Sequence, residues 1–188
     1  MIKIIGGKFK QTNLSVLKDF VRPTSSIKRE AIFSTIESYA LKNYKNLYKN
    51  NAVIDLFAGS GSVGLEAISR GMSKAVFFEN NKEVIKVLKK NCLKICNLDQ
   101  FKIVQQDIMK TELKINISPI SFIFIDPPYK KYSMIDLLSK IHKSKIINNE
   151  TIIVVEQHYS EKLEFSKEFR LVNNKIFGTT SLNFLILS

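Results

Sequence analysis

The feature that most constrains the fold of this chain is an alternation of short apolar runs with longer amphipathic segments between residues 52 and 156. It predicts strands at 52–57, 74–79, 101–105, 121–125 and 151–156, and helices around 63–69, 82–95 and 135–141. Strands that alternate with helices form a parallel sheet with helices on both faces. Two later β-rich runs, 170–176 and 181–187, flank Gly178-Thr179 and predict a hairpin. The expected fold is therefore α/β, with a mostly parallel seven-stranded sheet and a C-terminal β-hairpin.

The first fifty residues are expected to form a small β/α extension, which divides the chain into residues 1–50 and 51–188. Ile2 to Ile5, a Gly6-Gly7 turn and Lys8-Phe9-Lys10 predict a hairpin or arm rather than a core element. Arg22-Pro23-Thr24 marks a boundary, because a proline biases the residue before it away from helix. Apolar residues at helical spacing then predict a helix that ends before Asn50.

The chain is strongly basic, and much of the charge lies near the N-terminus. The net charge is +12, and residues 1–50 hold ten Lys and Arg against three acidic residues, a net charge of +7. A bias toward lysine explains the excess of Lys over Arg but does not explain this clustering. A polyanion is the natural partner of such a surface, because each neutralised phosphate releases condensed counterions. We therefore expect residues 1–50 to contact nucleic acid.

Other features bear on the compartment in which the protein works. The N-terminus lacks the apolar stretch of a signal peptide, and no run approaches the roughly 18 apolar residues of a transmembrane helix. Cys92 and Cys96 are four residues apart on one expected helix face, where a disulfide or a two-ligand metal site is possible. Two buried thiols are the favoured interpretation. We expect a cytoplasmic monomer that binds neither a membrane nor a metal.

A glycine-rich turn follows the first strand of the alternation. Gly59-x-Gly61-x-x-Gly64 matches the dinucleotide fingerprint, so an NAD-linked oxidoreductase is one interpretation. Glycines let the backbone approach a ligand closely, and the helix behind them supplies free N–H groups. Asp55 favours S-adenosylmethionine, because an acid at the strand end can receive a cationic amino-acid group and would repel a pyrophosphate. The alternative function of Asp55 is local hydrogen bonding to the turn. Phe57 belongs to the same candidate cofactor site.

Acidic residues also follow the second and third strands. Glu79, beside Asn80, could accept hydrogen bonds from both ribose hydroxyls of a nucleoside cofactor, or it could cap the next helix. Asp107 could accept the adenine amino group while Ile108 packs on the ring. An Asp after a strand is also a common turn residue, so this second assignment rests on less.

The fourth strand runs directly into Asp126-Pro127-Pro128-Tyr129. Two prolines stiffen this loop and remove two N–H donors, which leaves it rich in acceptors. An exocyclic amine on a base needs acceptors, since its lone pair is delocalised until both N–H groups are held. Asp126 and the Pro127 carbonyl could hold them, and Tyr129 could stack on a base turned out of its helix. The alternative is an ordinary turn after a buried strand.

At these residues the chain resembles the bacterial 16S ribosomal RNA guanine-N2 methyltransferase family, and the likeness spans almost the whole sequence. It covers Ile4-Ile5-Gly6-Gly7, Arg22-Pro23-Thr24, Arg29 to Phe33, Asp55 to Ala67, Phe78-Glu79, Asp126 to Tyr129 and Phe177 to Thr180. The resemblance implies a Rossmann-like class I methyltransferase fold, with S-adenosylmethionine as cofactor and S-adenosylhomocysteine as its product. The implied substrate is a guanine of 16S rRNA, presented by the RNA, the small ribosomal subunit or an assembly intermediate.

The resemblance also assigns functions to individual residues. Those implied to hold the cofactor are Asp55, Gly59, Gly61, Glu79 and Asp107. Those implied to hold the guanine are Asp126, Pro127 and Tyr129. The expected RNA contacts are Lys8, Lys10, Arg22 and Arg29. The chain departs from the family where Ser26 and Ile27 replace an Asp and a basic residue, and where Ser34 replaces a common Asn.

Two further functions compete with this one. A DNA adenine or cytosine amino methyltransferase usually needs a sizeable recognition domain, for which 188 residues leave little room. An RNA-binding assembly factor without activity would keep the fold, but loss of activity commonly erodes the acceptor loop, which is intact here.

Overall fold

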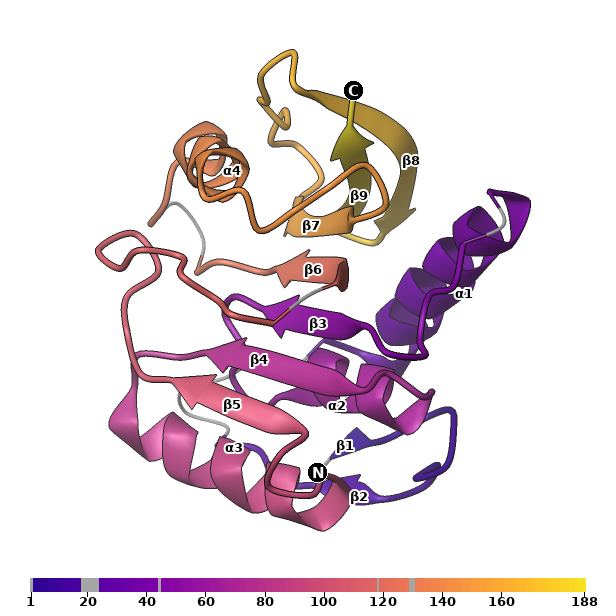
Figure 1. Ribbon diagram of the computed structural model, residues 1–188, viewed down its shortest axis with the longest axis vertical. Helices are drawn as coiled ribbons and strands as arrows, with labels where there is room; N and C mark the ends of the chain where they lie inside the picture. Colours follow the sequence, from indigo (N-terminus) through magenta and orange to yellow (C-terminus); the bar gives the residue numbers. More distant parts are fainter. Residues whose placement is uncertain (1, 18–23, 44, 118, 129–130) are drawn as a thin grey trace.

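The computed structural model describes residues 2–17, 24–43, 45–117, 119–128 and 131–188. Its main feature is a seven-stranded sheet in the order β5-β4-β3-β6-β7-β9-β8 (Figure 1). The strands are β3 (Ala52–Asp55), β4 (Lys74–Phe78), β5 (Phe101–Val104), β6 (Ile120–Ile125), β7 (Ile152–His158), β8 (Phe169–Phe177) and β9 (Thr180–Leu187). The first five strands of that order run parallel, whereas β9 lies antiparallel to both β7 and β8. The predicted parallel sheet and C-terminal hairpin are confirmed.

The four helices begin close to where the sequence predicts them. They are α1 (Ser26–Lys42), α2 (Ser62–Ser69), α3 (Lys82–Ile95) and α4 (Met134–Lys143). Three have a side-chain cap, because the oxygens of Ser25, Asn81 and Ser133 accept hydrogen bonds from the first-turn amides of α1, α3 and α4.

Alternate residues of the strands supply two separate cores, one on each face of the sheet. Val53, for example, packs with α1, α2 and α3 in one cluster, whereas Ile54 packs with α4 in the other. The face that α4 covers is completed by the long connection between β5 and β6, through Ile108 and Leu113. Helices therefore lie on both faces, and the carboxyl ends of the parallel strands meet at one edge, on the left of Figure 1.

The N-terminal hairpin, β1 (Ile2–Lys3) and β2 (Asn13–Leu14), is part of the main core. Ile4 and Leu14 have no exposed surface and belong to the same cluster as α1, α2 and α3. The prediction of an arm outside the core is therefore wrong for this hairpin. Burial of two full aliphatic side chains is worth about 3–6 kcal/mol, which is ample reason for so short a hairpin to pack on the domain.

Two smaller expectations are tested by the same part of the chain. Cys92 and Cys96 are free thiols buried in the core, as favoured above, and burial raises the pKa of the Cys96 thiol to about 12. Across the described residues, every helix is too short or too polar to cross a bilayer.

Candidate active site

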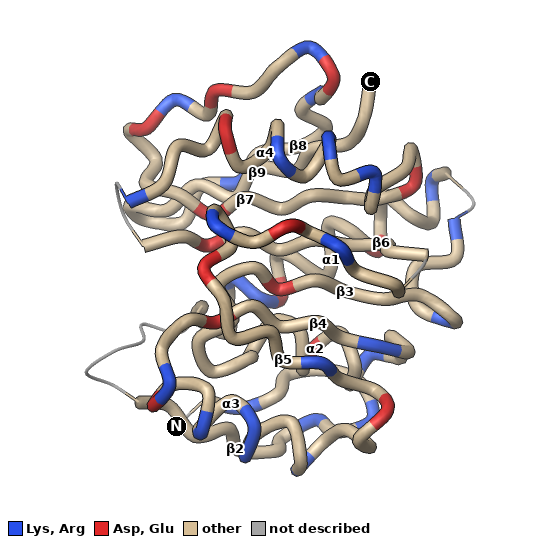
Figure 2. Tube along the Cα trace, turned by 60° about the vertical axis from the view of Figure 1, so that its left-hand side comes forward, with Lys and Arg blue, Asp and Glu red and all other residues tan. Residues whose placement is uncertain are grey.

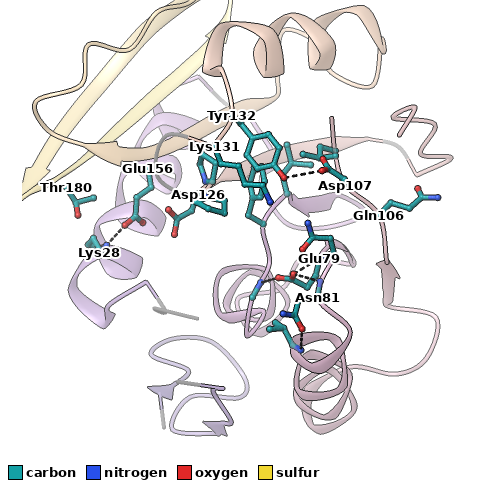
Figure 3. A pocket seen from close by; sticks show the side chains of 18 residues that line it. Lys28, Glu79, Asn81, Gln106, Asp107, Asp126, Lys131, Tyr132, Glu156 and Thr180 are labelled. Atoms are coloured by element: carbon teal, nitrogen blue, oxygen red, sulfur yellow. Dashed lines mark hydrogen bonds and ion pairs between the residues drawn. The ribbon is translucent and has the colours of Figure 1, made fainter. Parts of the chain in front are cut away.

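A cavity of about 350 Å³ opens at the carboxyl edge of the parallel sheet. Residues that follow β3, β4, β5 and β6 line it, together with Glu156 of β7 and the first turn of α1 (Figure 3). Ligands of open α/β sheets bind at this edge, beyond the carboxyl ends of the strands. The predicted site residues that line it are Phe57, Gly59, Glu79, Asn80, Asp107, Ile108, Asp126 and Pro127. Residues far apart in the sequence thus meet in one cavity.

The glycines of the turn have different functions. Gly59 has a φ of 51° and lines the cavity, so a backbone close to a ligand is provided there. Gly61, at a φ of 78°, is the N-cap of α2, and a Cβ on it would lie 2.5 Å from Leu88 Cδ1. Similarly, a Cβ on Gly64 would lie 2.4 Å from Cε1 of the Phe77 ring. Gly61 lies outside the lining of the cavity, and the structure gives it a function in helix packing, whereas its predicted contact with the cofactor stays a prediction.

Asp55 lies at the end of β3, almost completely buried, beside a second small cavity that it shares with Thr24, Gly59 and Asp126. One of its carboxylate oxygens accepts a hydrogen bond from the Gly64 amide at 3.3 Å. Burial, with a smaller contribution from the charge of Glu79, raises the pKa of Asp55 to about 7. The local hydrogen bond to the turn is therefore present, and it leaves a poorly solvated carboxylate next to the main cavity.

Glu79 is occupied largely by backbone amides. Oε2 accepts from Gly59 N at 3.1 Å, and Oε1 accepts from Asn80 N and Asn81 N, each at 2.9 Å. A carboxylate offers about four acceptor positions, so one position remains for a ligand hydroxyl. A second position becomes free if the bond to Gly59 opens. The capping alternative is wrong, because the side chain that caps α3 is that of Asn81.

Asp107 is held from two sides. It accepts hydrogen bonds from Met109 N at 2.9 Å and from the Tyr132 hydroxyl at 3.3 Å, while Ile108 contributes an apolar wall. The Tyr132 ring in turn lies 5.2 Å from that of Phe57, and both residues line the cavity. Tyr132 was absent from the sequence prediction. Its position shortly after the proline loop in the sequence is the local feature that could have indicated a place in the site.

Asp126 follows β6 and belongs to both cavities, with Pro127 beside it in the larger one. Burial raises the pKa of Asp126, and the nearby charge of Glu156 raises it further, whereas Lys28 opposes the shift. The acceptor loop therefore faces the same space as the residues after β4 and β5. Tyr129 lies outside the described residues.

Lys28 and Glu156 form an ion pair within this cavity that sequence reasoning missed. Lys28 comes from the first turn of α1 and Glu156 from the end of β7, so 128 residues separate them in the chain. Their side chains are 18% and 6% exposed, respectively. Glu156 is the last residue of the strand predicted at 151–156, as Glu79 is of the strand predicted at 74–79, and this placement is the signal that could have identified it.

The expected RNA-binding residues lie in different surroundings. Lys8 and Lys10 are exposed near the C-terminal end of α2, where Lys8 N donates to Ser69 O. Because α2 begins at the cavity and ends away from it, these lysines lie on the side of the molecule opposite the site (Figure 1). Arg22 is outside the described residues. Lysines also occur on α3, so the basic residues are not confined to the first fifty residues (Figure 2).

Arg29 is a correction to the prediction. Its residue exposure is 1%, and its guanidinium donates to Thr24 O at 2.7 Å and Lys3 O at 2.6 Å. The buried carboxylate of Glu66 lies 3.8 Å from its Nε. Arg29 thus joins the hairpin to the start of α1 and offers no surface to RNA. Among the described residues, no three His, Cys, Asp or Glu side chains are arranged to hold a metal ion.

The sheet order, the glycine turn and the acceptor loop together define a Rossmann-like class I methyltransferase fold. Within that class, the chain belongs to the family described as conserved hypothetical protein 95, whose profile matches residues 2–186. The protein named ribosomal RNA small subunit methyltransferase D of Buchnera aphidicola (from Acyrthosiphon pisum) is 31% identical over 177 residues, covering 93% of this chain and 87% of its own length. The protein of the same name from Haemophilus influenzae is 28% identical, covering 96% of this chain and 91% of its own.

Solved structures agree on the fold. An Escherichia coli protein described as a candidate methyltransferase has a TM-score of 0.81 at 22% identity, covering 100% of this chain and 98% of its own. An RNA methyltransferase from Salinibacter ruber, solved with S-adenosyl-L-homocysteine, has a TM-score of 0.60 at 13% identity, covering 89% and 95%. At these identities the likeness establishes the fold alone.

Proposed function

We propose that this protein transfers a methyl group from S-adenosylmethionine to the exocyclic N2 of a guanine in small-subunit ribosomal RNA. The observation that carries the proposal is that the acceptor loop at Asp126-Pro127 and the acids at the ends of β3, β4 and β5 border two adjacent cavities, which share Asp126, at one sheet edge. The names of the relatives support ribosomal RNA as the substrate. The working form we propose is a cytoplasmic monomer acting on the RNA, the subunit or an assembly intermediate.

The residues of the cavity fit S-adenosylmethionine. The Asp55 carboxylate is buried and suits a cationic amino group, while Glu79 retains an acceptor position for a ribose hydroxyl. Asp107 keeps acceptor capacity for an adenine amino group, with Ile108 and Phe57 as apolar walls. When bound, the cofactor supplies an electrophilic methyl group. A structural relative crystallised with S-adenosyl-L-homocysteine supports this choice of cofactor.

The acceptor loop would prepare the base nitrogen. The Asp126 carboxylate and the Pro127 carbonyl accept its two N–H groups, which fixes the nitrogen and directs its lone pair toward the cofactor. Positioning and electrostatics supply the rate gain in such a site, since no covalent enzyme intermediate is needed. The nitrogen must lose one proton after it is methylated. Asp126 is suited to take that proton because burial raises its pKa toward the neutral range.

Two measurements test the proposal. Calorimetry should show binding of S-adenosylmethionine, and binding of NAD instead would overturn the cofactor assignment. Mass spectrometry of ribosomal RNA from cells lacking the protein should show the loss of one N2-methylguanosine, restored by the wild-type gene. A loss confined to DNA would support an amino methyltransferase of DNA instead.

The variant Asp126→Asn separates chemistry from binding. We expect kcat to fall by about 10²-fold or more, because the amide cannot take the proton or hold the amine by charge. Affinity for S-adenosylmethionine should stay within about threefold of wild type, since the loop faces the substrate side of the cavity. Full activity of this variant would remove Asp126 from the mechanism.

A further inference from the structure

The ion pair between Lys28 and Glu156 has an unusual place for a structural contact. It lies inside the cavity, beside Asp126, and joins the first turn of α1 to the end of β7 (Figure 3). Holding two charges out of water is expensive, and such pairs often stabilise a fold no better than apolar residues would. A pair in this position therefore calls for a function beyond folding.

Glu156 is also only half satisfied. Lys28 occupies Oε1, whereas Oε2 is buried and finds no hydrogen-bond partner among the residues that the structure describes. A buried charged acceptor without a donor carries the full desolvation penalty of that oxygen. The side chain lines the main cavity and also a neighbouring one of about 240 Å³ beyond Pro127. The free oxygen therefore awaits a donor that a ligand in this space can bring.

The order of the three charged groups matches one base edge. Figure 3 shows the Glu156 carboxylate between that of Asp126 and the Lys28 ammonium, which gives the order acceptor, acceptor, donor. The Watson–Crick edge of guanine presents the complement in sequence: the N2 amine, the N1–H donor and the O6 acceptor. Adenine and cytosine would instead place a ring-nitrogen lone pair against the Glu156 carboxylate.

We infer that Glu156 and Lys28 are the base-recognition residues of this site, with Glu156 Oε2 accepting the N1–H of guanine and Lys28 donating to O6. The inference rests on the proposed function, because it assumes that Asp126 holds the N2 amine. It goes further by assigning the choice of guanine over other amino-bearing bases to two residues that the motifs do not contain. Repulsion between the Glu156 carboxylate and the ring-nitrogen lone pair of another base provides the rejection that selectivity requires.

The test uses a synthetic RNA that spans the methylated guanine and a second RNA with 2-aminopurine at that position. 2-Aminopurine keeps the N2 amine but lacks N1–H and O6. Wild-type protein should methylate 2-aminopurine with a kcat/KM about 10³-fold or more below that of guanine, because a site built around a hydrogen bond rejects its absence strongly. Glu156→Gln should lose about 10²-fold on guanine and little on 2-aminopurine, because its amide can donate to N1.

The second variant and the controls complete the test. Lys28→Met should also lose activity on guanine and keep its low activity on 2-aminopurine. Glu150→Gln, an exposed acid before β7, should match wild type on both RNAs. Calorimetry with S-adenosylmethionine confirms that each variant is folded. If wild type methylates guanine but Glu156→Gln keeps the full preference for guanine over 2-aminopurine, the inference about Glu156 and Lys28 is overturned and the proposed function stands. If wild type methylates neither RNA, the proposed function has failed.

Discussion

Asp55 shows how a single functional carboxylate can oppose folding. Its pKa of about 7 exceeds the ordinary value of 3.8 because burial disfavours the charged form. A raised folded-state pKa gives stability that is fully present below the unfolded value and is lost as the pH rises through the folded value. Between about pH 4 and pH 7, ionisation of Asp55 therefore destabilises the ligand-free protein. A cation bound against the carboxylate would recover that free energy.

We therefore expect Asp55→Asn to raise the melting temperature of the ligand-free protein at pH 8.5 by about 5 °C or more, and by roughly half as much at pH 5.5. Affinity for S-adenosylmethionine at pH 8.5 should fall by about tenfold or more, because the cation loses its partner. Scanning calorimetry and titration calorimetry provide the two readouts. Asp99→Asn, an exposed change of the same kind, is the control. An unstabilised variant at pH 8.5 would contradict the strain on Asp55.

At the scale of elements, α2 connects the N-terminal hairpin to the catalytic sheet. The Glu66 side chain has no exposed surface and accepts hydrogen bonds from Ile5 N at 2.9 Å and Gly6 N at 2.7 Å. Arg70 Nε donates to the same carboxylate at 3.1 Å, and Ser69 Oγ donates to Gly6 O at 2.6 Å. Glu66 of α2, the helix that follows the glycine-rich turn, thus fixes the Gly6-Gly7 turn.

Glu66→Gln should cost about 3 kcal/mol in free energy of unfolding, because it removes the charge that buried donors and two arginines face. Urea denaturation followed by circular dichroism gives the value. Glu30→Gln is the matched control, since Glu30 pairs with Arg70 at 2.8 Å but its side chain is 60% exposed. We expect the control to cost under about 1 kcal/mol. Equal losses in the two variants would show that Glu66 does not anchor the hairpin.

At the scale of the whole molecule, the basic surface reaches well beyond the cavity. Lys8 and Lys10 lie at the end of α2 that is far from the cavity. An RNA that touches them and also enters the site must therefore extend from one side of the protein to the other. A folded RNA or a ribosomal particle is large enough to do so. The net charge of +12 suits such a substrate, because many weak phosphate contacts add to the affinity.

The double variant Lys8→Glu/Lys10→Glu should weaken RNA binding and reduce the slope of log K against log salt by about 1.5, since two phosphate contacts are lost. Filter binding between low and physiological salt provides the measurement. Lys143→Glu/Lys145→Glu makes the same charge change at the end of α4. If the two double variants have equal effects, net charge alone governs RNA binding, and a specific contact at the hairpin is excluded.

The sequence by itself determined the alternation of strands and helices, the C-terminal hairpin and the placement of Asp55, Glu79, Asp107 and Asp126 at strand ends. These features follow from hydrophobic periodicity and turn-forming residues, which are encoded within a few neighbouring positions of the chain. The tertiary structure alone decided that Arg29 is buried, that the hairpin joins the core and that Lys28 meets Glu156. Each of these depends on a contact between distant segments, and a charged residue carries no local sign of whether its partner is phosphate, solvent or another side chain.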